Sequence, residues 1–409
     1  NPDMAGCVTY YTSLLPGSFK QYSTPYDSFW CCVGTGMENH AKYAESIYFK
    51  NGNSLLINLY IPSELNWKEQ GFRLRLDTDF PESDTISVCV VDKGRFSGSV
   101  MLRYPEWVEG NPEMMLNGRP VKLEYGKKEY IRLPDSIKSG DTIKIVLPRK
   151  LSVRYAKDEP HFGSIMYGPI LLAGELGTVV PGSDRVSDNR GLRKELPAQN
   201  IPALVGSLAD LDEWIIKDSA CDFTVKNEGK QKDVSLIPYF RMHHQYHTVY
   251  WKIYSPDEYA YRRKVLTDVV KIGDEASEKE HQLQGRNDSV YWHDFFWARN
   301  ARYRMAGDGG WFSYSLAIDK KERNPYYLIC RYWGDEPDTH VFDIYVDDKY
   351  LETVHLNRKL YLTYVDDVYK IPEAWTHNKS HVNVSFRAKE GKRAGGLYEL
   401  KITADPDYR

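Results

Sequence analysis

The sequence predicts a mainly β protein built from several modules in tandem, and three observations support this prediction. The chain has 409 residues, which is more than one hydrophobic core usually organises, so we expect several domains. From about residue 47 onward, apolar and polar residues alternate in short runs between turn residues, as in half-buried strands. Aromatic residues make up 13% of the chain, and Tyr and Trp suit both β-sandwich cores and the stacking of sugar rings.

Charge and hydropathy argue against two classes of partner. The net charge is −3, with 27% charged residues, so no field of one sign predicts binding to nucleic acid or to an anionic membrane. The mean hydropathy is −0.56, and no apolar run approaches the ~20 residues that cross a bilayer. Six dispersed cysteines are too few to predict a disulfide framework in a chain of this size.

Residues 1–48 differ from the rest of the chain because they contain a helical signal. The run "PGSFKQYSTPYDSFW" is punctuated by Pro and Gly and predicts a loop. Thr35 is then a candidate N-cap for a helix from about residue 37 to 44, with Glu38 and Lys42 spaced i, i+4. Such a short helix needs an outside partner to bury its apolar face.

The remaining residues divide into three expected β modules. Residues 49–152 predict a β-sandwich, which opens with a hairpin signal at Asn51 and Gly52. Residues 153–288 predict a second β-rich module with mixed loops, in which 255–290 suits a helix or a linker. Residues 289–409 predict a jelly-roll-like accessory module, with a turn at Asp347 and Asp348.

The stretch "DSFWCCVGTGMENHAKY", residues 27–43, places Cys31 and Cys32 side by side. Neighbouring cysteines cannot easily bridge each other, because a vicinal disulfide strains the backbone. Thiolates are both nucleophiles and zinc ligands, so the pair suits a metal site or covalent chemistry. The residues alone leave a second interpretation open, in which the pair fills space beside Phe29 and Trp30.

Two further groups have functional and structural interpretations. In "RMHHQYH", His243 and His247 would share one face of a strand and His244 the other. Their Cβ atoms would then lie ~13 Å apart, too far for one metal ion. Trp292, Trp297 and Trp311 suit either a sugar-stacking platform or core packing. Cys89, Cys221 and Cys330 sit in β-type or loop runs and indicate small core residues.

The segment "LLPGSFKQYSTPYDSFWCCVGTGMENHAKYAESIYF" closely resembles the end of the catalytic domain of β-L-arabinofuranosidase-type glycoside hydrolases, families 127 and 146. The run "CCVGTGMENH" is most similar to the family 146 version. Weaker resemblance in "MLRYPEW", "YGPILLAGE" and "YFRMHHQYHTVYW" extends to the sandwich modules that follow the barrel in this group. The tail from about residue 290 resembles an accessory domain of longer Bacteroidetes-type members.

The resemblance implies a retaining mechanism with a cysteine nucleophile. Carried over by position, Cys31 would be the nucleophile, and Cys31 and Cys32 would both bind zinc. The family's other zinc ligands, in a Glu-x-Cys arrangement, and its acid/base glutamate lie upstream, and no Glu-x-Cys precedes Cys31 here. We therefore expect the C-terminal part of such an enzyme, with the last helical piece of an (α/α)6 barrel and no activity of its own. Glu38 and His40 are then candidates for a supporting role near the site.

Two functions follow as hypotheses. The first is part of an enzyme that releases β-L-arabinofuranose from plant cell-wall arabinan, pectin side chains or arabinosylated glycoproteins. The alternative is a non-catalytic β-sandwich protein with a carbohydrate-binding or structural role. For the enzyme we expect a periplasmic or secreted location, a plant polysaccharide or oligosaccharide as partner, and zinc as cofactor.

Overall fold

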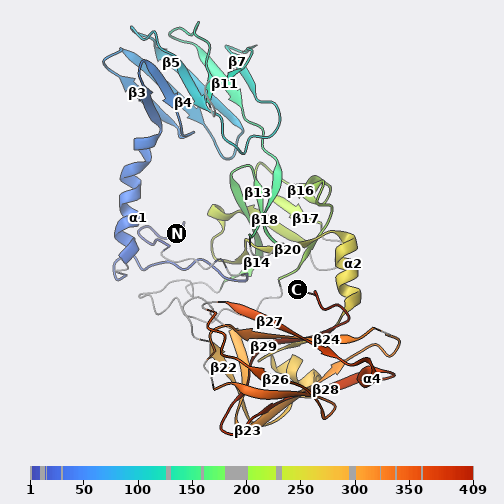
Figure 1. The fold of residues 1–409 in the computed structure, drawn as a ribbon. Coiled ribbons are helices and arrows are strands. Elements are labelled where there is room, and N and C mark those ends of the chain that lie inside the picture. The colour runs from blue at the N-terminus through green and yellow to red at the C-terminus, as the bar shows by residue number, and fades with distance from the viewer. Residues whose placement is uncertain are drawn as a thin grey trace. The chain divides into compact units, whose positions relative to one another are not determined.

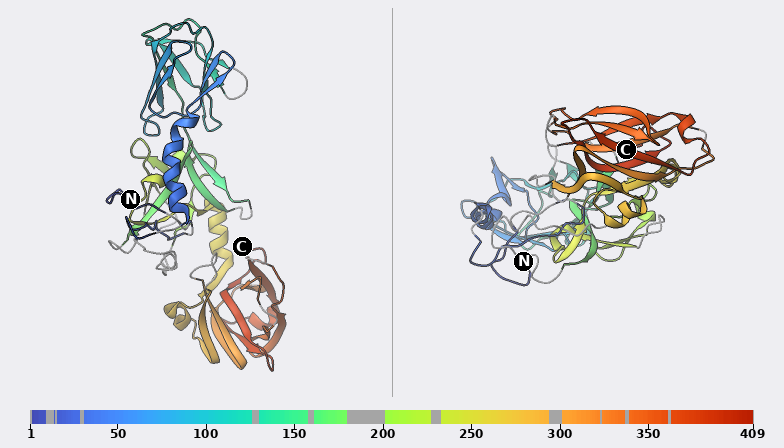
Figure 2. Two further views of the ribbon diagram at one scale, coloured as in Figure 1. Left: turned by 90° about the vertical axis from the view of Figure 1, so that its left-hand side faces the viewer. Right: turned by 90° about the horizontal axis from the view of Figure 1, so that it is seen from below.

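The computed structural model describes residues 2–9, 14, 16–28, 31–125, 130–157, 161–179, 201–226, 233–293, 301–322, 324–336, 339–360 and 363–408. The fold is mainly β, as predicted, and the chain separates into two compact units, Asn1–Ser255 and Pro256–Arg409. Both units consist largely of sheets, whereas helix α1 (Cys31–Lys42) stands out near the start of the chain (Figures 1 and 2). Within the described ranges, no helix is both long enough and apolar enough to cross a bilayer.

Helix α1 corrects the predicted helix boundary. It begins at Cys31 rather than after Thr35, so Thr35 lies inside the helix and is not its N-cap. Gly34 and Gly36 do not end the helix, although glycine is unfavourable in a helix interior. Lys42 pairs with Glu45 at 2.9 Å rather than with Glu38. The 3-10 turn η1 (Tyr43–Ser46) follows directly.

The first β module consists of two sheets that share one core. A five-stranded sheet has the order β1-β2-β6-β10-β9, and a six-stranded sheet has the order β3-β4-β5-β11-β7-β8. Residues from both sheets form one core, with Ile57 and Leu102 on one side and Phe72 and Val88 on the other. The strands are β1 (Tyr48–Asn51), β2 (Ser54–Ile57), β3 (Ser63–Trp67), β4 (Phe72–Thr78), β5 (Thr85–Asp92), β6 (Val100–Arg103), β7 (Glu113–Leu116), β8 (Arg119–Pro120), β9 (Glu124–Tyr125), β10 (Tyr130–Arg132) and β11 (Thr142–Val146).

The hairpin predicted near Asn51 is confirmed. Strands β1 and β2 pair with Asn51 opposite Ser54, and Gly52 adopts φ +59°. A positive φ is inexpensive for glycine, so this residue allows the chain to reverse within two residues.

The second β-rich module also belongs to the first unit. Its nine-stranded sheet has the order β15-β20-β13-β14-β18-β17-β16, with β12 on β13 and β19 on β14. Trp251 is fully buried in the core of this sheet. The elements are β12 (Leu151–Tyr155), β13 (Phe162–Tyr167), β14 (Ile170–Thr178), β15 (Leu204–Val205), η3 (Leu211–Glu213), β16 (Ile215–Lys217), β17 (Phe223–Val225), β18 (Val234–Pro238), η4 (Tyr239–Arg241), β19 (Gln245–Thr248) and β20 (Trp251–Tyr254).

The second unit contains another nine-stranded sheet around its own core. The sheet has the order β26-β25-β28-β23-β29-β24-β27, with β21 on β29 and β22 on β23. Residues 256–288, expected in the preceding module, form α2, β21, α3 and the start of β22 in this unit. The elements are α2 (Pro256–Val265), β21 (Leu266–Lys271), α3 (Glu275–Glu280), β22 (Gln284–His293), β23 (Ala301–Ala317), β24 (Tyr326–Trp333), β25 (Val341–Val346), β26 (Lys349–His355), β27 (Tyr364–Ile371), α4 (Glu373–Thr376), β28 (His381–Ala388) and β29 (Ala394–Thr403).

A buried charged cluster fixes α3 to the sheet of the second unit. The guanidinium of Arg304 donates to both carboxylate oxygens of Glu278, at 3.0 and 2.8 Å, and also to Asp288. The hydroxyl of Tyr314 donates to Glu278 at 2.8 Å. Because these side chains are buried, the carboxylates depend on Arg304 to offset the cost of losing water.

Candidate functional site

The cysteine pair lies at the start of α1. Cys31 and Cys32 occupy the first two positions of the helix, and their side chains lie outside what the structure describes. A helix N-terminus carries unpaired N–H groups and a partial positive charge, which stabilise a thiolate. The backbone position therefore suits a reactive cysteine, while the roles of Cys31 and Cys32 in catalysis and zinc binding stay predictions.

Glu38 and His40 lie further along α1, and both are exposed. The Nδ1 of His40 donates to the carbonyl oxygen of Gly36 at 3.1 Å, and its ring centroid lies 5.4 Å from that of Tyr43. These contacts are local to the helix and explain the position of His40 without a ligand. A supporting role for either residue stays a prediction.

The segment that precedes α1 is docked on strand β19. The N–H of Gly17 donates to the carbonyl of His247 at 2.9 Å, and the N–H of His247 donates to the carbonyl of Ser18 at 2.7 Å. This pair of bonds is an antiparallel bridge between Ser18 and His247. A second bridge, between Thr9 and Tyr22, joins two parts of the N-terminal segment itself. The segment is thus tied to the second β-rich module by backbone bonds.

Histidines of "RMHHQYH" hold this docked segment, and their geometry differs from the predicted one. His243 and His244 precede β19 rather than lying in it, and His244 has φ +53°, so strand alternation does not relate them to His247. The hydroxyl of Tyr22 bonds to Nδ1 of His243, and Nε2 of His244 lies 2.8 Å from a carboxylate oxygen of Asp3. Among the described residues, no group of three or more metal-ligating side chains occurs.

The buried face of the docked segment has shifted pKa values. His247 is fully buried, and burial lowers its pKa to about 4. Burial likewise lowers the pKa of His243 to about 4 and that of Lys20 to about 8. The ammonium of Lys20 donates to the carbonyl of Tyr239 at 2.7 Å and lies 4.5 Å from the centre of that ring. The contact between the docked N-terminal segment and the second β-rich module therefore favours the neutral forms of His243 and His247.

Of the three tryptophans expected to form a platform, the structure describes the side chain of Trp311. Trp311 lies half-buried in β23. Trp297 and the side chain of Trp292 lie outside the described residues. A sugar-stacking role for this set stays a prediction.

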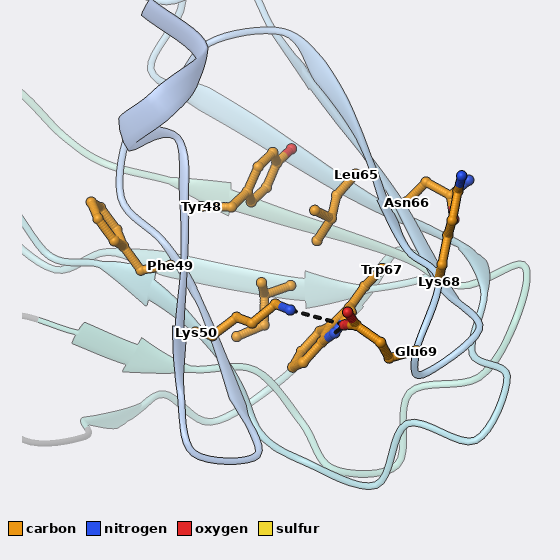
Figure 3. A pocket seen from close by; sticks show the side chains of 9 residues that line it. Tyr48, Phe49, Lys50, Leu65, Asn66, Trp67, Lys68 and Glu69 are labelled. Carbon is orange, nitrogen blue, oxygen red and sulfur yellow. Dashed lines mark hydrogen bonds and ion pairs between the residues drawn. The ribbon is translucent and has the colours of Figure 1, made fainter. Parts of the chain in front are cut away.

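A pocket that the sequence did not indicate lies in the first sandwich (Figure 3). It has a volume of about 300 Å³. Lys50 and Glu69 form an ion pair of 2.9 Å beside Trp67. The paired residues are nineteen positions apart and come from opposite sides of the pocket, so no short motif announced them. The lining residues are Tyr48, Phe49, Lys50, Leu55, Leu65, Asn66, Trp67, Lys68 and Glu69.

Comparisons with protein families divide the chain into four matched segments. Residues 1–45 match the catalytic domain of the family 127 β-L-arabinofuranosidases, and residues 54–149 match the middle domain of the same enzymes. Residues 152–253 match a domain of unknown function, and residues 263–403 match a family of unknown function. No match was found among curated proteins.

Solved structures that match part of this structure include glycoside hydrolases. One, described as a glycoside hydrolase, is 19% identical with a TM-score of 0.45, and the match covers 61% of this chain and 45% of that one. A family 127 β-L-arabinofuranosidase from Geobacillus stearothermophilus T6 is 16% identical with a TM-score of 0.39, covering 58% and 39%. A family 35 carbohydrate-binding module from Paenibacillus barcinonensis is 13% identical with a TM-score of 0.25, covering 34% and 97%.

The chain spans less than half the length of the two glycoside hydrolase structures. The family comparison nevertheless agrees with the resemblance inferred from the sequence, both for residues 1–45, which contain α1, and for residues 54–149, which follow it. The resemblance inferred from the sequence is thereby confirmed: the chain matches, one after the other, the end of the catalytic domain and the middle domain of the family 127 β-L-arabinofuranosidases.

Proposed function

We propose that this chain is the C-terminal part of a retaining glycoside hydrolase that releases β-L-arabinofuranose from plant cell-wall polysaccharides or oligosaccharides. The observation that carries the proposal is the position of Cys31 and Cys32. Both lie within the segment that matches the catalytic domain, and both lie in the first turn of α1. We also propose that the enzyme belongs to family 146 in particular, and that it is periplasmic or secreted.

In the proposed reaction, the sulfur of Cys31 attacks the anomeric carbon of the sugar. A carboxylic acid donates its proton to the leaving oxygen as the glycosidic bond breaks, and a thioglycosyl intermediate forms. Water then displaces the sulfur, with the same carboxylate as base, so the sugar is released with retained configuration. The N–H groups at the start of α1 would favour the thiolate form that this attack needs.

Cys31 and Cys32 would hold zinc in the complete enzyme. Two thiolates are soft donors that suit this ion, and a structural zinc site needs four ligands. The pair would therefore supply two of the four ligands. Bound zinc would keep the sulfur atoms deprotonated near neutral pH.

We further propose that these 409 residues do not hydrolyse glycosides by themselves. The resemblance assigns the acid/base glutamate and two zinc ligands to sequence other than this, and Glu38 is an exposed residue of α1. The acid that protonates the leaving oxygen would therefore come from outside the chain.

The first experiment measures zinc and thiol reactivity. The 409-residue chain is equilibrated with zinc, and bound metal is counted in the wild type, Cys31→Ser, Cys32→Ser and the control Cys89→Ser. We expect each change in the pair to reduce bound zinc, whereas the control does not, because Cys89 lies apart from the pair in β5. In metal-free protein, Cys31 should be alkylated by iodoacetamide faster than buried Cys221 and Cys330, whose thiol pKa values are raised by burial.

The second experiment measures activity on the polypeptide as its source organism makes it. The substrate is p-nitrophenyl β-L-arabinofuranoside, and the variants are Cys31→Ser and Cys89→Ser. We expect the first variant to lose hydrolysis and the second to retain it. Hydrolysis that survives in Cys31→Ser would contradict the nucleophile assignment, and hydrolysis by the isolated 409 residues would contradict the proposed need for an outside acid.

A further inference from the structure

We infer that the pocket beside Trp67 is a binding site for an uncharged saccharide unit. The pocket lies at an open edge of the sandwich, because β1 and β3 are the terminal strands of their respective sheets. Alternation along β1 directs Tyr48 and Lys50 to the side opposite Phe49, and Leu65 and Trp67 share one face of β3 (Figure 3). The volume of about 300 Å³ falls at the small end of the range for small-molecule sites.

The floor of the pocket is apolar and held in place. Leu55 and Trp67 are 1% and 7% exposed, and both belong to the sandwich core. The indole of Trp67 packs against Phe96, with ring centroids 5.6 Å apart. Its Nε1–H donates to Glu69 Oε2 at 2.6 Å. A fixed aromatic ring beside aliphatic carbon suits the C–H face of a sugar.

The rim of the pocket supplies both a hydrogen-bond acceptor, on Glu69, and hydrogen-bond donors, on Lys50. The ammonium of Lys50 donates to Glu69 Oε2 at 2.9 Å and lies 4.8 Å from the centre of the Trp67 ring. Both donors thus use the same carboxylate oxygen, and in the described part of the chain Glu69 Oε1 accepts no hydrogen bond. Lys50 keeps further N–H groups. A free acceptor and free donors side by side fit neighbouring sugar hydroxyls, each of which both donates and accepts.

Charge at the rim favours a neutral ligand. The positive charge of Lys50 is already balanced by Glu69. A carboxylate ligand would compete with Glu69 for that ammonium, and a cationic ligand would compete with Lys50 for the carboxylate. A polyhydroxylated ligand without charge can use both groups while the ion pair stays formed.

The pocket is joined directly to the candidate catalytic segment. The turn η1 ends at Ser46, two residues before β1 begins. Asn58 fixes this junction, since its backbone N–H donates to the carbonyl of Ile47 at 2.8 Å. The inference itself does not depend on Cys31 or on zinc.

The test follows the Trp67 resonance during sugar titrations. The full chain is labelled with fluorotryptophan, and its ten tryptophan signals are recorded by 19F NMR, with Trp67 assigned through Trp67→Phe. The probes are methyl glycosides of L-arabinose, D-galactose and D-xylose, with D-galacturonate as the charged comparison. We expect at least one neutral sugar to shift the Trp67 signal saturably, and Glu69→Gln to weaken its binding about tenfold, as for loss of a charge-assisted hydrogen bond.

Matched variants distinguish binding in this pocket from binding elsewhere on the chain. Asp233→Asn removes another exposed ion pair, with Lys226 at 2.7 Å, and should leave sugar binding unchanged. Cys31→Ser should also leave it unchanged, so a failed proposal for Cys31 would not affect the result. Lys50→Met provides a second exposed change at the rim, and because Lys50 Nζ lies 4.8 Å from the centre of the Trp67 ring, this variant should shift the Trp67 signal and so identify it if Trp67→Phe does not fold.

Three results would overturn the inference. The first is the absence of any saturable shift of the Trp67 signal with the neutral sugars. The second is equal affinity in the wild type, Glu69→Gln and Lys50→Met. The third is tighter binding of D-galacturonate than of every neutral sugar, which would show an anion site instead.

Discussion

Acidification should release the N-terminal segment from β19, because His247 must be neutral in the docked state. The imidazole is fully buried, and Nδ1 donates to the carbonyl of Gln245 at 3.4 Å. Its Nε2 has no hydrogen-bond partner within the described residues. Burial, with a smaller effect of the Lys20 charge, lowers its pKa from 6.5 to about 4. Protonation would place a charge where no acceptor receives it.

The sign and size of the effect follow from this shift. A histidine with a lowered pKa stabilises the docked state above pH 6.5, and this contribution is lost as the pH falls toward about 4. A shift of 2.5 units, from 6.5 to about 4, corresponds to at most about 3 kcal/mol. Between about pH 7 and pH 5 the loss is about 2 kcal/mol, or about 30-fold in the opening equilibrium. His243 shifts in the same direction and would add to the effect.

Hydrogen exchange followed by mass spectrometry measures this opening locally. We expect protection of the peptide that contains Gly17 and Ser18 to fall about 30-fold between these two pH values, after correction for the intrinsic rate. The variant His247→Phe removes the titrating group and should show a much smaller pH dependence. If wild-type protection does not change, or falls equally in His247→Phe, the titration of His247 does not control docking.

Three further predictions concern stability. Replacing Arg304 with Ala leaves its two carboxylate partners buried without a counter-charge, and denaturant unfolding of the second unit should show a loss of about 3–5 kcal/mol; a loss below about 1 kcal/mol would contradict the described network. In Gly174→Ala the new Cβ would lie 2.4 Å from ring carbons of buried Trp251, so the free energy of unfolding of the first unit should fall by about 1–3 kcal/mol. Gly36 has open space around it, so Gly36→Ala should raise the free energy of unfolding by up to about 1 kcal/mol. Burial, with the nearby charge of Asp335, raises the pKa of Glu336 to about 7, so the second unit should lose stability as the pH rises from 4.5 to about 7. Thermal unfolding measures this dependence on pH, and Glu336→Gln should make it flatter. The same dependence in Glu336→Gln as in the wild type would refute the prediction.

Local sequence signals predicted the tight hairpins well. Gly52 supplies a positive φ between β1 and β2, as expected for this kind of turn. Asp347 and Asp348 do the same between β25 and β26, with φ +48° and +62°; a left-handed conformation at both central residues matches the twist of the flanking strands. The residues that decide these turns are neighbours in sequence, so a short window contains the information.

Pairings between distant residues could not be read in this way. Strand β21 pairs with β29 across more than a hundred residues, which is why 256–288 were expected in the preceding module. Strands β2 and β6 pair in parallel, and the alternating pattern of residues 49–152 gave no indication of this direction. Alternation reports which face of a strand is buried, and it does not report the neighbour against which the strand lies.

The sites show the same limit. The cysteine pair was visible because its members are adjacent, while the start of α1 was misplaced because Thr35 and two glycines suggested a later boundary. Lys50, Trp67 and Glu69 form a pocket from two different sheets, and no spacing in the sequence links β1 to β3. The available signal was the position of Trp67 two residues before Glu69, at the end of an edge strand. Without knowledge of the fold, this spacing is only a weak indication of a pocket.

The docked segment also changes the interpretation of the module that follows the sandwich. Residues 17–23 end eight positions before Cys31, and they are held by His247 in a region that matches a domain of unknown function. Backbone bonds to β19 restrict where the segment before α1 can lie. The histidines predicted to be irrelevant to metal binding therefore gain a structural role, because they anchor the chain that leads into the proposed nucleophile. A change at His247 should then disturb the reactivity of Cys31 through the position of this segment, and the iodoacetamide rate of Cys31 in His247→Phe would measure that coupling.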